Sequence, residues 1–186
     1  MKKLMIALVA AAVGIAANAA SYSWNATSGR LYDGTDTTGS DHYVGGTAYL
    51  LFTSVLSQED LVTAFAADAA TAASTVSTKA LSSATLASAR VGDTSFTADV
   101  TTDQSAYFVV FNGDNMYISD AIEATYAAVG DSDIAFGSLT ASSRALPKDA
   151  SAGYSTAGWY QSVPEPTSGL LMLLGMAGLA LRRRRA

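Results

Sequence analysis

The fold class follows from one stretch, Ala106-Tyr107-Phe108-Val109-Val110-Phe111, which is followed by Asn112-Gly113-Asp114-Asn115 and then by Met116-Tyr117-Ile118-Ser119. Aromatic and β-branched residues dominate the first segment and recur in the third, as is typical of strands. Asn-Gly between two such segments supplies the positive φ angles that a tight hairpin turn requires. The stretch therefore predicts a central β-hairpin.

Further strand signals, each a short alternating or continuous apolar run, lie at residues 21–24, 49–52, 94–100 and 133–139. Residues 49–52 are apolar enough to be buried on both faces of a sheet. Residues 144–162 predict a last strand or an ordered tether. Short strands separated by turns at roughly ten-residue intervals are typical of sandwiches. We therefore expect a mainly β protein, with a single β-sandwich or jelly-roll-like domain over residues 20–162.

One short helix is expected within this domain. Ser57 is a suitable N-cap, and the acidic residues that follow it favour the positive end of a helix. An apolar residue then recurs every fourth position, at Leu61, Phe65 and Ala69. Residues 71–88 are mainly Ser, Thr and Ala, and their pattern assigns neither helix nor strand.

The N-terminus has the three parts of a secretory signal peptide. Met1-Lys2-Lys3 is charged, residues 4–17 are apolar, and Ala17-Asn18-Ala19 places small residues where signal peptidase requires them. We expect cleavage after Ala19, with Ala20 as the alternative position. Residues 1–19 are therefore predicted to be a signal-peptide helix that is absent from the exported protein.

The C-terminus carries a second membrane signal over residues 163–186. Val163-Pro164-Glu165-Pro166 precedes an apolar run at 169–181, and Arg182, Arg183, Arg184 and Arg185 follow. As a helix the run would span roughly 20 Å, less than the ~30 Å of a typical hydrocarbon core. The arginines should stay on the cytoplasmic side. The segment predicts a short transmembrane helix.

These C-terminal parts, in this order, resemble the PEP-CTERM sorting signal. The resemblance implies recognition of Pro164, Glu165 and Pro166 by an exosortase, a membrane protease that removes the tail during export. It also implies association with the cell surface or with exopolysaccharide, in a bacterium with two membranes. The alternative interpretation is an ordinary C-terminal tail anchor. With the signal-peptide positions included, the sorting and processing residues that the resemblance implies are Ala17, Ala19, Pro164, Glu165, Pro166 and Arg182 to Arg185.

The charge distribution restricts the function classes. Six of the eleven basic residues lie in the two terminal signals, so five basic residues face all sixteen acidic ones in residues 20–166, a formal charge of −11. An acidic domain argues against nucleic acid as a partner, because phosphates require Lys and Arg. The absence of cysteine excludes disulfides, thiolate metal sites and a cysteine nucleophile.

Catalytic and metal sites have weak signals. His42 is the only histidine, and no Gly-x-Ser-x-Gly motif accompanies it. Glu59 and Glu123 could form a glycosidase pair, although Glu59 is explained by a helix start. Aspartates at 33–41, with 112–115 and 131–133, could bind Ca²⁺, but aspartates are also common in turns. We therefore expect no cofactor, with Ca²⁺ as the one candidate.

The aromatic residues leave a choice between structure and carbohydrate binding. Flat rings can stack on sugars but more often form the core, and the candidates are Tyr22, Trp24, Tyr154, Trp159 and Tyr160. The sequence favours a non-enzymatic cell-surface or extracellular-matrix protein with a structural or adhesive domain, and a secreted carbohydrate-binding module is the alternative. The expected partners are signal peptidase, the exosortase and the membrane, with exopolysaccharide as a further candidate.

Overall fold

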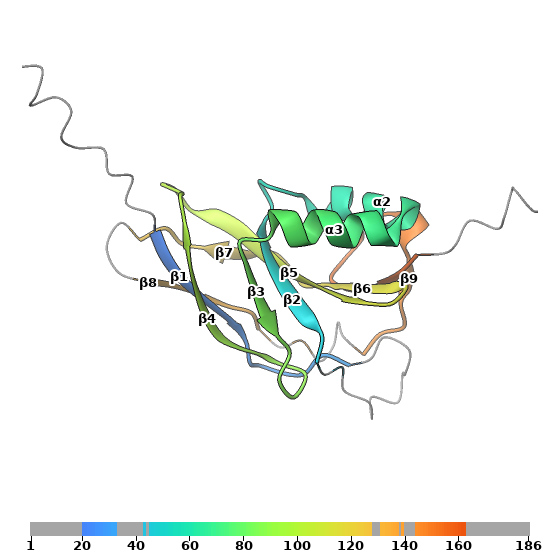
Figure 1. Cartoon of the computed structure of the whole chain (residues 1–186), viewed down its shortest axis with the longest axis horizontal. Coiled ribbons are helices and arrows are strands. Elements are labelled where there is room, and N and C mark those ends of the chain that lie inside the picture. Colours follow the sequence, from blue (N-terminus) through green and yellow to red (C-terminus); the bar gives the residue numbers. More distant parts are fainter. Residues whose placement is uncertain are drawn as a thin grey trace, which may run out of the picture.

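The computed structural model describes residues 20–32, 43, 45–127, 131–137, 139 and 144–162, which form two sheets and a helical layer (Figure 1). The strands are β1 (Ala20–Ala26), β2 (Thr47–Phe52), β3 (Ser82–Thr85), β4 (Val91–Ala98), β5 (Gln104–Asn112), β6 (Asn115–Ile118), β7 (Ile122–Ala124), β8 (Asp131–Ala135), β9 (Lys148–Asp149) and β10 (Gly158–Gln161). The helices are α2 (Gln58–Ala67), α3 (Ala69–Lys79) and the 3₁₀ helix η1 (Ala150–Ala152).

The smaller sheet has the strand order β4-β1-β8. Its central strand β1 is antiparallel to β4 and parallel to β8, with Trp24 opposite both Thr94 and Ile134. Buried and partly exposed residues alternate along β1, because only one face of this sheet is covered. Tyr22 and Trp24 point into the space between the two sheets and are fully buried.

The larger sheet has the order β3-β2-β5-β6-β10-β9, and β7 pairs with β5. All five residues from Ala106 to Val110 are buried, because the sheet is covered on both faces. Phe108 and Trp159 pack toward the smaller sheet, whereas Tyr107 and Tyr160 pack toward the helices. The structure fits a β-sandwich with helices as a third layer. The parallel pairs β1·β8 and β9·β10 are not expected of an antiparallel jelly roll.

The predicted hairpin is present, with its turn centred one residue later than Asn-Gly. Asn112 pairs with Asn115, so Gly113 and Asp114 form the two-residue turn. Gly113 has a φ of 56°, and neither Asn112 nor Asp114 has a positive φ. A positive φ at the first turn position alone is the pattern of a type II′ turn, which favours Gly there.

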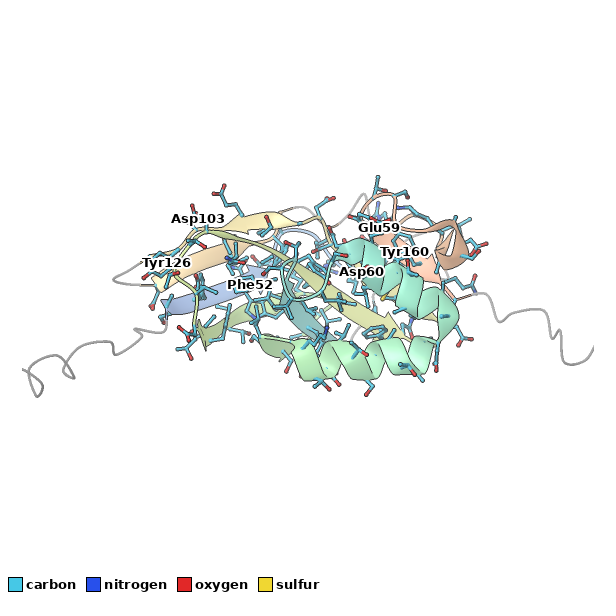
Figure 2. The ribbon with its side chains drawn as sticks, turned by 90° about the horizontal axis from the view of Figure 1, so that it is seen from above. Phe52, Glu59, Asp60, Asp103, Tyr126 and Tyr160 are labelled. Carbon is cyan, nitrogen blue, oxygen red and sulfur yellow. The ribbon has the colours of Figure 1, made fainter. Side chains whose placement is uncertain are left out.

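The expectation of one helix was wrong, because two α-helices follow β2. The first begins after Ser57, as predicted, and the Ser57 hydroxyl accepts a hydrogen bond from the Asp60 N–H. The second begins after Asp68, whose carboxylate accepts the N–H groups of Ala70 and Thr71. This helix buries only two residues, Ala72 and Val76, so its sequence has too little apolar periodicity to reveal it. Figure 2 shows both helices side by side above the larger sheet.

The two ends of the domain lie far apart. The start of β1 and the β9–β10 pair are at opposite ends of the long axis in Figure 1. In Figure 2, Asp103 and Tyr126 lie toward the first end, and Tyr160 lies toward the second. In the part of the chain that the structure describes, no helix is both long and apolar enough to span a bilayer. The helices predicted for the signal peptide at 1–19 and for the sorting signal at 163–186 lie outside the described residues.

Candidate functional site

The last strand, β10, is an integral part of the larger sheet. It pairs antiparallel with β6, where Trp159 lies opposite Tyr117, and parallel with β9, where Tyr160 lies opposite Lys148. The side chains of Trp159 and Tyr160 are fully buried, on opposite faces of the sheet. Residues 144–162 therefore end in a strand, one of the two outcomes expected from the sequence, and this strand is needed to close both cores.

Polar contacts fix the loop that leads into β10. The ammonium of Lys148 donates to the carbonyl oxygens of Thr156 and Ala157, at 2.8 and 3.1 Å. The hydroxyl of Tyr160 accepts from the N–H groups of Ser155 and Thr156 and donates to the Thr156 carbonyl oxygen at 2.7 Å. Burial raises the pKa of Tyr160, but the hydrogen bonds that its hydroxyl accepts from Ser155 and Thr156, together with the nearby Lys148 charge, outweigh burial and leave the pKa below its ordinary value.

Ser162, directly after β10, is attached to the turn of the central hairpin. Its N–H donates to the carbonyl oxygen of Asp114 at 3.0 Å, and its hydroxyl reaches the same oxygen at 3.4 Å. No local pattern in the sequence links residue 162 to residue 114, so this attachment is seen only in the structure. The paired and hydrogen-bonded part of the domain thus extends to Ser162.

Residues 162–185 match the PEP-CTERM protein-sorting motif. The match contains Pro164, Glu165 and Pro166 and the four arginines Arg182 to Arg185, so the resemblance identified from the sequence is confirmed. The motif marks the chain as an exported precursor that is anchored in the membrane and sorted by an exosortase. No curated protein and no solved structure was found to match the chain.

The sorting motif and the folded domain share one residue, Ser162. The structure describes Ser162 alone among the matched residues. The triplet and the arginines lie outside the described residues, as do the signal-peptide positions Ala17 and Ala19. The processing roles of these individual residues therefore stay predictions.

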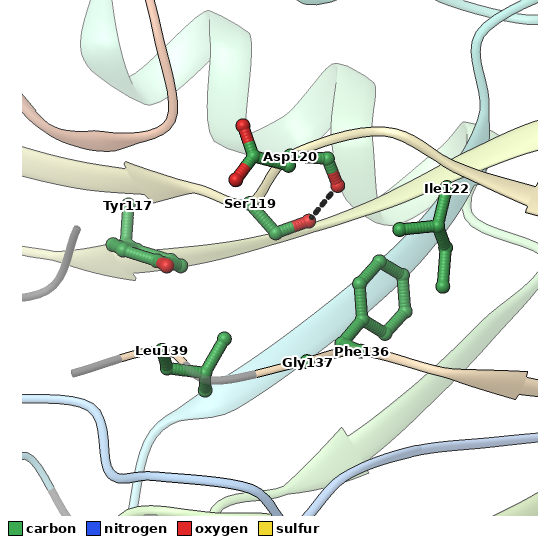
Figure 3. Close-up of a pocket in the computed structure, with 7 residues that line it drawn as sticks. All are labelled: Tyr117, Ser119, Asp120, Ile122, Phe136, Gly137 and Leu139. Atoms are coloured by element: carbon green, nitrogen blue, oxygen red, sulfur yellow. Dashed lines mark hydrogen bonds between the residues drawn. The ribbon is translucent and has the colours of Figure 1, made fainter. Parts of the chain in front are cut away.

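A small pocket opens between the two sheets next to the end of β6 (Figure 3). Its volume is about 210 Å³, and it is lined by Tyr117, Ser119, Asp120, Ile122, Phe136, Gly137 and Leu139. The Ser119 hydroxyl donates to the Asp120 carbonyl oxygen at 2.9 Å and accepts the Phe108 N–H at 3.0 Å. The Ser119 hydroxyl is therefore hydrogen-bonded to two backbone groups, and it links β5 to the loop between β6 and β7.

Most of the candidate sugar-stacking residues are in the core. Tyr22, Trp24, Trp159 and Tyr160 are all fully buried. Tyr154 alone among the five candidates is partly exposed, and its ring stacks on that of Tyr160 with centroids 6.0 Å apart. A fully buried ring presents no face to a sugar, so these aromatics support the structural interpretation over the carbohydrate-binding one.

The candidate acidic residues are dispersed. Glu59 lies in the first turn of α2 and Glu123 on β7, both exposed. Asp133 on β8 accepts hydrogen bonds from the side chains of Ser23 and Asn25, at 3.3 and 3.4 Å. Within the described ranges, no three His, Cys, Asp or Glu residues lie close enough to hold a metal ion. His42 and the aspartate-rich segment 33–41 lie outside the described residues.

Proposed function

We propose that the mature protein is a non-enzymatic structural or adhesive component of the cell surface or extracellular matrix. The observation that carries this proposal is the sorting motif joined, without a linker, to a folded β-domain at Ser162. Such an arrangement delivers a folded domain to the outside of the cell. The signal sequence at 1–19 supplies the export step, and the exosortase removes the C-terminal segment.

The interior of the domain supports a structural role. Its largest aromatic side chains pack against each other in the cores; Trp159, for example, lies edge-on to Tyr117 with centroids 5.6 Å apart. The hydroxyl of Ser119, which lines the pocket, is hydrogen-bonded to two backbone groups. We propose no reaction and no cofactor for this domain. Exopolysaccharide is the proposed matrix partner, bound through the polar outer surface.

Replacing Pro164, Glu165 and Pro166 by alanine tests the sorting step. We expect export to continue and the precursor to accumulate in the membrane fraction, because the processing protease loses its recognition site. Substitution of the adjacent Thr167 and Ser168 by alanine is the matched control and should leave processing intact. Mass spectrometry of membrane and medium fractions gives the readout. Release of the triplet variant at the normal mature mass would show that the triplet is not a processing signal.

The location is tested by fractionation of the native host. The mature protein should begin at Ala20 and be found with the cell surface or the matrix, and enzymatic removal of exopolysaccharide should release it. Retention of Met1 in exported protein would contradict the signal-peptide assignment. A protein that stays entirely in the periplasm would contradict the surface assignment.

A further inference from the structure

The distance between the folded domain and the recognition triplet is limited by covalent geometry. An extended chain advances at most ~3.6 Å per residue, so Pro164 lies within about 7 Å of Ser162 and Pro166 within about 14 Å. Ser162 is held at the Asp114 carbonyl oxygen. The triplet therefore cannot move away from the end of the domain that carries Asp114 unless the chain before it detaches.

Detachment of that chain has a large cost. β10 lies between β6 and β9 in the larger sheet, and pulling it out would expose the fully buried rings of Trp159 and Tyr160. Among residues 158–162, only Gln161 and Ser162 are not buried. Local opening of the folded domain is thus restricted to the very end of the strand.

A membrane protease that cleaves within such a motif must hold several substrate residues in an extended conformation. The folded domain is much wider than the short segment that separates it from the triplet. We propose that the folded domain hinders access to its own sorting motif, so that docking of β10 slows processing. This inference rests on the proposed function, because it requires that the motif is the processing site.

The consequence is an order of events. Chains whose last strand has not yet joined the sheet present the triplet on an unstructured segment and are processed first. Folded chains are processed only when the attachment of Ser162 to Asp114 opens. The rest of the domain and the protease then compete for the residues at the end of β10 that precede the triplet.

A spacer between the folded domain and the triplet tests whether the domain limits access to the motif. Insertion of about six Gly and Ser residues between Ser162 and Val163 adds up to roughly 20 Å of reach and leaves every described contact in place. In a pulse–chase experiment on the full-length precursor in its native host, the spacer variant should convert to the mature form faster than the wild type. An unchanged or slower conversion would overturn the inference.

A single substitution tests the attachment itself. Ser162→Pro removes the N–H donor to Asp114, and loss of one ordinary hydrogen bond should raise the open fraction, and with it the processing rate of folded chains, about fivefold. Ser162→Ala keeps the N–H and is the matched control, with a rate close to the wild type. Equal rates for Ser162→Pro and Ser162→Ala would overturn the role assigned to this hydrogen bond.

The spacer variant also distinguishes this inference from the proposed function. The spacer is combined with alanine at Pro164, Glu165 and Pro166, and this double variant should remain unprocessed. Processing of the double variant would contradict the proposed function. If the wild-type chain requires the triplet but the spacer does not change the rate, only the inference about access fails.

Discussion

The indole N–H of Trp24 donates a hydrogen bond to the hydroxyl of Ser82, at 3.0 Å. Trp24 lies on β1 in the smaller sheet and Ser82 on β3 in the larger one, so the bond joins the two layers of the sandwich. Trp24 is fully buried, and a buried indole N–H without a partner is costly. Ser82 thus allows a polar atom to lie inside an otherwise apolar interface.

Ser82→Ala should therefore lower the free energy of unfolding by about 1–3 kcal/mol, because it leaves the Trp24 N–H buried and unpaired. The neighbouring Ser83 on the same strand is exposed, and Ser83→Ala should change stability by less than about 0.5 kcal/mol. Urea unfolding of the two variants of the exported domain gives the comparison. Equal stability of the two variants would contradict the structural role of the Trp24–Ser82 bond.

Removal of the hydroxyl group from each of two tyrosines should change the free energy of unfolding in opposite directions. The Tyr22 hydroxyl is buried without a hydrogen-bond partner among the described residues, whereas the Tyr107 hydroxyl donates to the Leu56 carbonyl oxygen at 2.8 Å. Tyr22→Phe should raise the free energy of unfolding by roughly 1 kcal/mol, because it removes an unpaired polar group. Tyr107→Phe should lower it by about 1 kcal/mol. Thermal unfolding checks both signs, and destabilisation by Tyr22→Phe would show that its hydroxyl has a partner.

Local sequence patterns predicted most of the strands, but not β3 or β7 and not the arrangement of the strands. The continuous apolar run at 49–52 indicated a strand with two covered faces, and Leu50, Leu51 and Phe52 are buried in the structure. The alternation at 21–24 indicated a strand with one covered face. The parallel pairing of β1 with β8, more than 100 residues later, has no local signal. It depends on which apolar faces fit together once all the strands exist.

The second helix shows why weak patterns fail. Its N-cap, Asp68, directly follows α2, so a single residue separates two helices. Apart from its last residue, Lys79, the exposed face of α3 consists of Ala, Ser and Thr, and its sequence therefore shows little apolar periodicity. The cap itself was the signal that could have been used, because Asp at residue 68 precedes an alanine-rich segment.

Acid should weaken α3 through its cap. The Thr71 hydroxyl, followed by the N–H groups of Thr71 and Ala70, holds the pKa of Asp68 below its ordinary value of 3.8. The folded state therefore favours the carboxylate, and the resulting stability is complete above the unfolded pKa and is lost as the pH falls through the folded pKa. The stability advantage of the wild type over Asp68→Asn should shrink as the pH falls below about 4. Thr71→Ala, which removes the largest cause of the shift, should show a smaller pH dependence. An advantage that is constant with pH would contradict this assignment.

One part of the sorting site can be recognised from the sequence, and another part only from the structure. Pro164-Glu165-Pro166, the apolar run and the arginines are contiguous, and a contiguous motif can be identified without a structure. The attachment of Ser162 to Asp114 joins the residue after β10 to the turn before β6 and follows only from the register of β10 against β6. The boundary between the domain and the motif can therefore be located only from the structure.

That boundary can be tested by truncation. A chain of residues 20–162 should fold as the complete domain, and a chain of residues 20–157, which lacks β10, should not. The shorter chain loses the fully buried side chains of Trp159 and Tyr160, and β6 keeps its pairing with β5 but loses its pairing with β10. Removal of one buried aromatic side chain typically costs about 3–5 kcal/mol, and the total stability of a domain is only about 5–15 kcal/mol.

Near-ultraviolet circular dichroism and thermal unfolding of the two chains provide the measurement. The longer chain should show ordered aromatic signals and one cooperative transition, and the shorter chain should show neither. Trp159→Ala in the longer chain is an intermediate case and should lower the free energy of unfolding by about 3–5 kcal/mol. Leu146→Ala is the matched control, because Leu146 is 61% exposed and its loss should change stability by less than about 0.5 kcal/mol. Cooperative unfolding of residues 20–157 would place the domain boundary before β10, and Ser162 would then lie on a linker instead of at the end of the fold.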